Sequence, residues 1–366
     1  MKITDQISRI IVGGLFIFSG LIKLNDPIGT EIKMEEYFEV FAKDFGSFFE
    51  IFIPWALEIA MIMIVLEIAL GVAVLLLYRM NITAWVLLLL MIFFTFLTGY
   101  SAILNKVTDC GCFGDFIKLT PWQSFWKDIF LMFFVVHLWW YRNRYVAVLR
   151  SREGNFAIIA TAVLATYAGI HAINHLPYFD WRAYKVGNNI PHEMQPPAAA
   201  IGQYIFKKDG EEIKSDKYLP PEQGYEYVSY KILNEDEIKP KITDYAVTSV
   251  DGNDVTQETF TGTKLIIVMV DVDKASTKNI ADIRSLLQAV DGKMDTYILT
   301  SSSSENTERF RHENQLAVPY YFVDATVLKT IIRSNPGITL WKDGTVLGNW
   351  HHNDTPTASE VEALVQ

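Results

Sequence analysis

Apolar residues form long stretches in the first half of the chain and short, interrupted runs in the second half. A helix needs about 20 mostly apolar residues to cross a bilayer. Five stretches reach or approach this length, and the stretch 51–77 is the clearest. The predicted spans are 7–24, 51–77, 82–104 and 122–141, followed by a fifth and weaker span within 151–175. The pattern therefore predicts a membrane-embedded helical bundle.

Basic residues mark one side of these spans. The loop 141–152 between the last two spans contains four arginines and no acid, the loop after the second span contains Arg79, and Lys2 precedes the first span. Because cytoplasmic loops are enriched in Lys and Arg, we expect a cytoplasmic N-terminus in a bacterial inner membrane. No small-x-small cleavage site follows the first span, so we expect this span to be retained. The segments expected on the extracytoplasmic, periplasmic side are 25–50, 105–121 and everything after about residue 175.

The second half has a different pattern. The segment 176–241 is rich in proline and charge and predicts a linker with short strands at 200–207 and 224–232. From residue 242, short apolar runs alternate with amphipathic segments, which favours an α/β domain over 242–366. The expected elements of this domain are a lead-in hairpin at 244–256, strands at 265–270, 295–300, 320–323, 337–341 and 346–350, and helices at 277–290, 305–314, 328–333 and 359–365.

The charges are divided as unevenly as the apolar residues. The chain has 366 residues and a net charge of −10, of which residues 1–175 contribute −1 and residues 176–366 contribute −9. The acidic balance argues against nucleic-acid binding, which needs a basic face. The two cysteines of the chain exclude a disulfide-rich scaffold and a four-cysteine zinc site, and we expect no metal.

Both cysteines lie in one extracytoplasmic loop, as Cys110-Gly111-Cys112. Glycine between them gives the backbone the freedom that a small, strained disulfide requires. A strained, exposed disulfide is typically labile or catalytic, so the pair is a candidate redox centre. The helical bundle beside it can hold a lipid-soluble quinone as the cofactor. The alternative is a structural disulfide that fixes a tight loop, and the residues alone leave both readings open.

Charged residues inside the spans are further candidates. Glu58 and Glu67 lie in the second span, and nine residues at 100° each place them on opposite helix faces. A carboxylate in hydrocarbon usually faces a bundle interior, a partner or water, and the depth of Glu58 matches the cysteine loop better. Lys127 and Asp128 begin the fourth span near the same loop, where Lys127 can pair with a glutamate or favour a thiolate. Structural polar contacts are the alternative for each.

Three stretches of the first half carry a family resemblance. They are residues 9–30, which begin Arg-Ile-Ile-Val-Gly-Gly, residues 33–37, and the loop Cys-Gly-Cys-Phe-Gly-Asp of 110–115 with the following 119–128. With them, residues 5–145 resemble the DoxX-like membrane proteins, and in particular their four-helix MauE branch. The resemblance implies a transmembrane bundle over 1–150. It also implies extracytoplasmic thiol–disulfide or quinone-linked redox chemistry beside a thioredoxin-like partner.

The order of elements over 242–366 resembles the thioredoxin fold. Pro336, just before a predicted strand, stands where that family carries a cis-proline. The loop 271–276 stands where it carries a catalytic C-x-x-C, yet the loop has no cysteine. Dithiol exchange needs a thiol, so we expect a binding or docking module.

Two functions follow from these observations. The first is a quinone-linked thiol–disulfide oxidoreductase of the membrane, with Cys110 and Cys112 as the catalytic pair and Glu58, Lys127 and Asp128 as supporting polar residues. The second is a non-enzymatic assembly factor whose cysteineless domain binds a partner protein. Both place the chain in a lipid bilayer with an extracytoplasmic protein partner or redox client, and neither involves nucleic acid.

Overall fold

The computed structural model describes residues 2–107, 113–235 and 237–366. It divides into two compact units, residues 1–181 and residues 182–366. We describe each unit by itself.

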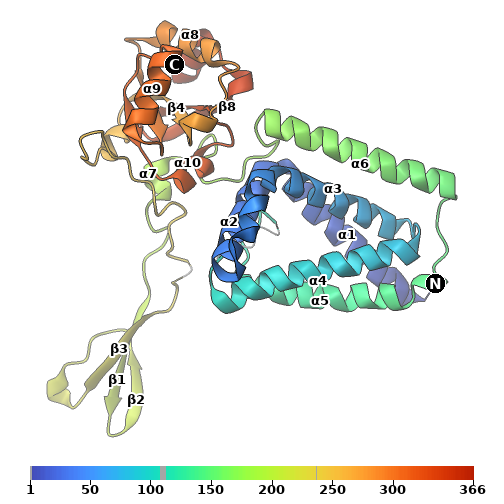
Figure 1. Ribbon diagram of the computed structural model, residues 1–366. Helices are drawn as coiled ribbons and strands as arrows, with labels where there is room; N and C mark the ends of the chain where they lie inside the picture. Colours follow the sequence, from blue (N-terminus) through green and yellow to red (C-terminus); the bar gives the residue numbers. More distant parts are fainter. Residues whose placement is uncertain (1, 108–112, 236) are drawn as a thin grey trace. The chain divides into compact units, whose positions relative to one another are not determined.

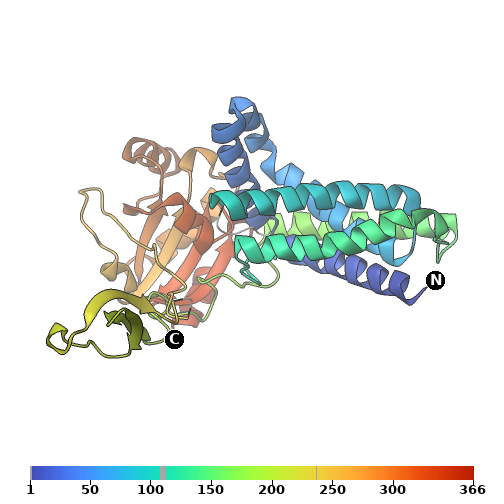
Figure 2. The same ribbon diagram turned by 90° about the horizontal axis from the view of Figure 1, so that it is seen from below.

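The first unit is a bundle of long helices (Figure 1). Helix α1 packs along α3, α4 packs along α5, and α6 lies against α3 (Figures 1 and 2). The bounds of these helices are α1 (Ile3–Asn25), α3 (Ala56–Leu75), α4 (Met80–Leu104), α5 (Pro121–Trp140) and α6 (Ser151–Asn174), with a short 3-10 turn η2 (Arg142–Arg144) after α5.

Glycines allow α1 and α3 to approach closely. A Cβ atom added at Gly71 of α3 would lie 2.9 Å from the carbonyl oxygen of Gly13 and 2.9 Å from the backbone nitrogen of Ile17. A Cβ atom at Gly20 of α1 would lie 2.5 Å from the Ile68 side chain. Small residues at such contacts let helix backbones pack directly in membranes. This packing fixes the register of the two helices that carry much of the site.

Four helical stretches among the described residues are long and apolar enough to cross a bilayer: Ile3–Asn25, Ser47–Leu75, Met80–Leu104 and Ser151–Asn174. The span expected at 122–141 coincides with α5, which is not one of the four. Its first turns carry Gln123, Lys127 and Asp128, which lower its apolar character. Its crossing of the bilayer stays a prediction.

An additional helix, α2 (Pro27–Phe45), lies at one end of the bundle (Figure 1). The Asp26 side chain caps its start by accepting a hydrogen bond of 2.9 Å from the backbone nitrogen of Gly29, and Pro27 occupies the first turn, where its missing N–H costs nothing. A 3-10 segment, η1 (Ser47–Trp55), connects it to α3. Tyr37 and Phe41 of α2 are buried in an aromatic cluster with Tyr100 of α4.

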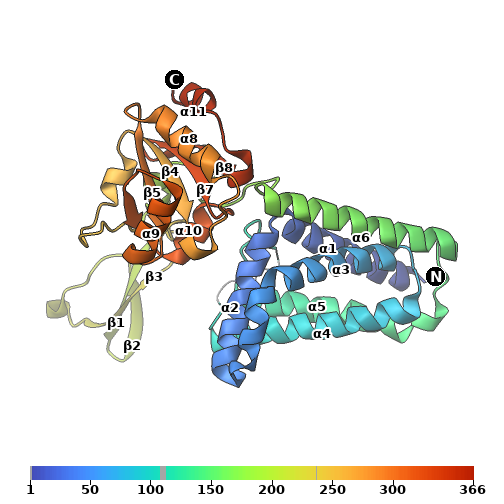
Figure 3. The same ribbon diagram turned by 45° about the horizontal axis from the view of Figure 1, so that its top comes forward.

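The second unit contains two sheets (Figure 3). Three antiparallel strands in the order β2-β1-β3 form the first, and five strands in the order β6-β5-β4-β7-β8 form the second. Strands β4, β5 and β6 are parallel to one another. Strand β7 pairs with β4 in the antiparallel direction, and β8 pairs with β7 in the antiparallel direction. The strand bounds are β1 (Gly202–Lys208), β2 (Glu211–Ser215), β3 (Glu226–Ile232), β4 (Thr263–Met269), β5 (Asp295–Thr300), β6 (Tyr320–Phe322), β7 (Gly337–Lys342) and β8 (Thr345–His351).

Helices cover both faces of the five-stranded sheet. Leu265 and Ile267 of β4 point toward Leu286 of α8, Phe310 of α9 and Val361 of α11 in one buried core. Helix α10 packs on β4 and β5 outside this core. The bounds are α8 (Ile280–Val290), α9 (Ser304–Asn314), α10 (Ala325–Ile331) and α11 (Ala358–Val365), with the short turns α7 (Ile190–Glu193), η3 (Pro221–Gln223), η4 (Gln257–Phe260), η5 (Val272–Lys274) and η6 (His352–Asp354). This is a thioredoxin-like α/β arrangement.

The elements agree closely with the sequence pattern over most of the chain, apart from the unpredicted helix α2, shifted helix bounds at α8 and α10, and two differences among the strands. The expected lead-in hairpin at 244–256 is present only as a short antiparallel turn around the Thr248–Asp254 bridge, with a hydrogen bond between Val247 and Val255, and is too short to form named strands. Strand β2 was not predicted, since its residues Glu-Glu-Ile-Lys-Ser are mostly charged and its burial is low.

Candidate functional site

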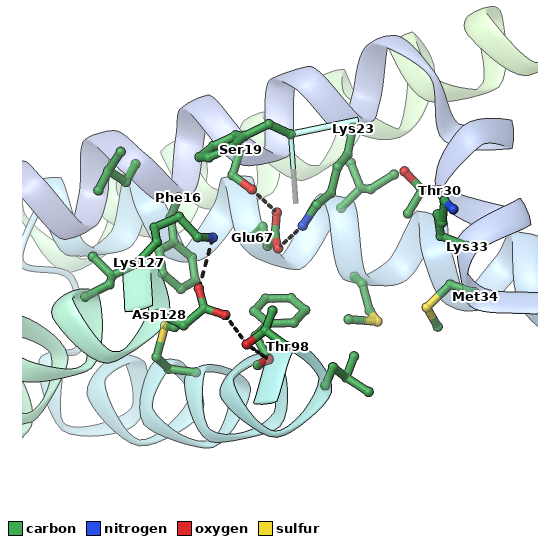
Figure 4. Close-up of a pocket in the computed structure, with 18 of the residues that line it drawn as sticks. Phe16, Ser19, Lys23, Thr30, Lys33, Met34, Glu67, Thr98, Lys127 and Asp128 are labelled. Atoms are coloured by element: carbon green, nitrogen blue, oxygen red, sulfur yellow. Dashed lines mark hydrogen bonds and ion pairs between the residues drawn. The ribbon is translucent and has the colours of Figure 1, made fainter. Parts of the chain in front are cut away.

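A cavity lies inside the helical bundle (Figure 4). Helices α1, α2, α3, α4 and α5 line it, together with Phe113, and it encloses about 90 Å³. Most of its walls are apolar. Its charged and hydroxyl-bearing side chains are Ser19, Lys23, Thr30, Lys33, Tyr37, Glu67, Thr98, Lys127 and Asp128.

The first polar group of the cavity joins α1 to α3. The Lys23 ammonium lies 2.5 Å from Oε1 of Glu67, and the Ser19 hydroxyl donates a hydrogen bond of 3.4 Å to Oε2 of Glu67. Ser19 and Lys23 share a helix face because they are four residues apart. The side chains of Lys23 and Glu67 are only 12% and 3% exposed. An ion pair this deeply buried in an apolar bundle marks a functional site by default.

The second polar group joins α5 to α4. The Lys127 ammonium lies 2.9 Å from Oδ1 of Asp128, and the Thr98 hydroxyl donates a hydrogen bond of 2.9 Å to Oδ2 of Asp128. The Asp128 side chain is 2% exposed, whereas Lys127 is 26% exposed. Figure 4 shows this group and the Lys23–Glu67 group facing the cavity from two different sides. The site thus combines two buried ammonium–carboxylate pairs with apolar walls.

The composition of the walls, which are mostly apolar with a few lysine N–H donors, is compatible with a neutral ring that carries carbonyl oxygens. An engineered apolar cavity of about 150 Å³ holds benzene, so a ring needs more room than the enclosed space of about 90 Å³. Met34, Met63 and Met91 line the cavity, and methionine side chains are flexible enough to adapt to a ligand. The lysines lie over aromatic rings, Lys23 at 4.9 Å from the Phe94 centroid and Lys127 at 5.1 Å from that of Phe113. The donors and the apolar walls therefore have the chemistry that a quinone requires, and the volume of about 90 Å³ means that a ring would enter only with movement of the methionine side chains.

Among the described residues, some of the predicted site residues line the cavity and one does not. Cys110 and Cys112 lie outside the described residues, but Phe113, which directly follows Cys112, lines the cavity. Lys127 and Asp128 line the cavity and pair with each other. Glu58 is exposed in the first turn of α3 and is not among the cavity residues. The carboxylate that α3 contributes is Glu67.

Lys23 and Thr98 are site residues that sequence reasoning did not select. A lysine near the end of an apolar span is expected to extend toward the membrane surface, but Lys23 is buried and pairs with Glu67. Threonine in a span carries no signal of its own, and only the helix packing brings Thr98 to Asp128. The available signal was the spacing of Ser19 and Lys23, which places two polar groups on one face.

In the second unit, hydrogen bonds and an ion pair connect the loop 271–276 to Asn335 and to Arg309 of α9. The Ser276 backbone nitrogen donates a 2.9 Å hydrogen bond to the carbonyl oxygen of Asn335, and the Asn335 side-chain amide donates one of 2.8 Å to the carbonyl oxygen of Asp271. Asp273 forms a 2.6 Å ion pair with Arg309 of α9. The peptide bond between Asn335 and Pro336 is cis. The loop therefore packs directly beside the cis-proline.

The first part of the chain is similar to a known protein family. Residues 1–141 match the family model described as methylamine utilisation protein MauE. The MauE resemblance of the sequence is thereby confirmed over this region, while the wider DoxX-like relationship stays a prediction. A protein of Flavobacterium psychrophilum, Protein TlpB, is 30% identical over 166 residues, which are 43% of this chain and 41% of that protein. The chain thus spans less than half the length of this curated relative.

Solved structures with a similar fold match about a third of the chain. The thiol peroxidase from Chromobacterium violaceum is 19% identical with a TM-score of 0.27, covering 34% of this chain and 83% of its own. StoA from Bacillus subtilis is 13% identical with a TM-score of 0.26, covering 33% of this chain and 96% of its own. The first part of the chain is thus similar to the MauE family model, and an α/β domain with a five-stranded sheet follows.

Proposed function

We propose that this protein carries out thiol–disulfide chemistry at the membrane, with Cys110 and Cys112 as the redox pair and a membrane quinone as the electron acceptor. The observation that carries the proposal is Phe113. It directly follows Cys112 in the chain and lines the cavity that holds both buried ion pairs. The loop that contains the two cysteines of the chain is thus directly followed in sequence by a residue that lines the charged cavity.

The chemistry divides between the cysteines and the cavity. Oxidation of two thiols to a disulfide releases two electrons and two protons, and a quinone, when bound, accepts both. Apolar walls from α1, α3 and α4 suit the ring and exclude water from it. The Lys23 and Lys127 ammonium groups provide N–H donors for carbonyl oxygens. Lys127 also provides a positive charge that favours a thiolate nearby.

The proposed location follows the charge pattern. The arginine-rich loop 141–152 and the N-terminus face the cytoplasm of a bacterial inner membrane, and the cysteine loop and the thioredoxin-like domain face the periplasm. This is the compartment in which disulfides persist.

Thiol trapping in cells tests the proposal. We expect Cys110 and Cys112 to be oxidised in cells that contain their quinone and to become reduced when quinone synthesis is blocked. A pair that stays oxidised without quinone contradicts the redox function and indicates a structural disulfide. The double variant Cys110→Ser, Cys112→Ser should abolish any thiol-dependent phenotype, and the Glu58→Gln variant serves as a control outside the cavity.

A second candidate is an assembly factor whose thioredoxin-like domain binds a partner protein. It is favoured by the loop 271–276, which contains no cysteine and is held by the Asn335 hydrogen bonds and the Asp273–Arg309 pair. This domain can bind but cannot exchange disulfides. A stable stoichiometric partner that the cysteine double variant still binds and assembles would favour this candidate over the first.

A further inference from the structure

We propose that the Lys23–Glu67 and Lys127–Asp128 pairs form two matched poles that bind and protonate the two carbonyl oxygens of a para-dione, a ring with carbonyls at opposite ends. The inference rests on the proposed function and specifies its acceptor. It also assigns proton-handling roles to Glu67 and Asp128.

The two poles have the same chemical composition. Each contains a lysine ammonium, a carboxylate, a hydroxyl that donates to the carboxylate, and a phenyl ring beneath the ammonium. The hydroxyls are those of Ser19 and Thr98, and the rings are those of Phe94 and Phe113. Helices α1 and α3 provide the charged and hydroxyl groups of the first pole and α4 provides its ring, while α5, α4 and the segment before α5 provide those of the second. Because the same four kinds of group occur in both poles, we infer a ligand with two similar ends.

The charge balance favours a neutral ligand. Each pole pairs one ammonium with one carboxylate, so each is formally neutral. The third lysine of the cavity, Lys33, pairs with Glu36 at 2.9 Å. A bound anion would therefore find no excess positive charge to compensate its desolvation. An ammonium carries three N–H donors, so a lysine can keep its carboxylate partner and still donate to a carbonyl oxygen.

The proton balance requires two such poles. When two thiols reduce a dione, two S–H bonds break, one S–S bond forms, and two O–H bonds form at the two ring oxygens. The lysine ammoniums lie 2.5 Å from Oε1 of Glu67 and 2.9 Å from Oδ1 of Asp128, so each pole contains a proton donor beside a proton acceptor. In each pole the ammonium can donate one proton to one ring oxygen, and the carboxylate can then accept a proton released by the thiols and return it to the lysine.

The two poles differ in their access to solvent. Lys127 is 26% exposed and lies on the helix that follows the cysteine loop, whereas Lys23 is 12% exposed. Because Lys127 is the more exposed of the two lysines, we expect the Lys127–Asp128 pole to exchange protons with solvent and to receive those released by the thiols. The Lys23–Glu67 pole is the more enclosed anchor.

A comparison of two ligands tests the inference. Menadione has two ring carbonyls, and tetralone is a similar bicyclic molecule with one. Binding of both is measured on the full-length Cys110→Ser, Cys112→Ser protein in lipid nanodiscs, so that no thiol can add to the ring. We expect menadione to bind about tenfold more tightly than tetralone, because tetralone leaves one charged donor without its acceptor.

Variants of the poles should remove this preference. In Glu67→Gln or Asp128→Asn the two ligands should bind within about twofold of each other, while Glu58→Gln, on the exposed side of α3, should keep the tenfold preference. Ser19→Ala and Thr98→Ala are milder variants in case the carboxylate variants do not fold, and each should reduce the preference partly. With the cysteines intact, Asp128→Asn should shift the pH profile of menadione-dependent thiol oxidation, and Asp128→Glu should restore it.

The outcomes separate this inference from the proposed function. Equal binding of menadione and tetralone to the parent protein, with no effect of the pole variants, overturns the two-pole inference but leaves a quinone-linked function intact. Absence of binding of either ligand overturns both. An unchanged pH profile in Asp128→Asn contradicts the proton-handling role of that residue.

Discussion

The Lys23 ammonium on α1 and the Glu67 carboxylate on α3 form an ion pair 2.5 Å apart, with side chains 12% and 3% exposed. The pair joins two helices whose backbones already pack closely at Gly13 and Gly71. Removal of one partner leaves an uncompensated charge in an apolar bundle, which is more costly than loss of both. The pair therefore contributes to folding as well as to the cavity.

We expect Lys23→Met to destabilise the bundle by about 3–5 kcal/mol, because it leaves the Glu67 carboxylate buried without its ammonium. The double variant Lys23→Met, Glu67→Leu should recover most of this loss, since it buries no charge. Reversible unfolding in mixed micelles measures the three free energies. A double variant less stable than the single variant Lys23→Met would contradict this explanation.

A second prediction concerns the segment that follows α6. The side chain of Asn25, at the end of α1, makes two hydrogen bonds of 2.8 Å with the backbone of Phe179. Asn25→Leu should cost about 1–3 kcal/mol, because two hydrogen bonds to the Phe179 backbone are lost, each worth roughly 0.5–1.5 kcal/mol. It should also increase protease cleavage near residues 176–181. Asn174→Ala is the matched control, since Asn174 is exposed and its side-chain amide donates to the Ile170 carbonyl within its own helix.

A third prediction concerns pH. Burial, and secondarily the Lys278 ammonium, lowers the pKa of His352 below its ordinary value, while Asp354 acts in the opposite direction. The unfolded chain then binds a proton at higher pH than the folded domain does. The stability of the domain should therefore fall as the pH decreases below about 6.5, the ordinary pKa of histidine.

Hydrogen exchange of β7 and β8, which lie next to His352, provides the measurement. Protection should decrease between neutral and mildly acidic pH in the natural chain and decrease less in His352→Gln. An identical pH dependence in the two proteins would show that another group is responsible.

Local patterns predicted most of the fold. The run Asp-Thr-Tyr-Ile-Leu-Thr is β5 with the expected bounds of 295–300, because β-branched and aromatic residues fill it and turn residues flank it. Helix α8 begins at Ile280, three residues later than expected, since residues 277–279 form turns rather than helix. Helix α2 was missed because its mixture of charged and aromatic residues resembles an exposed segment, and tertiary contacts of Tyr37 and Phe41 stabilise it.

The site was less predictable than the fold. Lys127 and Asp128 could be selected because two charges at the start of a span are unusual. The pairing of Lys23 with Glu67 joins residues 44 positions apart. It depends on the register of α1 against α3, which the close approach of backbones at Gly71 decides. The register of two packed helices cannot be read from a single sequence. Depth in the span was the available criterion, and it favoured Glu58, whereas Glu67 lines the cavity.

The last prediction tests that register directly. Gly71→Ala should destabilise the bundle by about 1–3 kcal/mol, because the new methyl group would lie 2.9 Å from backbone atoms that cannot move independently. It should also weaken menadione binding, since separation of α1 from α3 disrupts the Lys23–Glu67 pole. Gly14→Ala, where an added Cβ has no heavy atom within 4 Å, should be neutral or stabilising by up to about 1 kcal/mol through helix propensity. Equal effects of the two substitutions would contradict the close packing of α1 and α3.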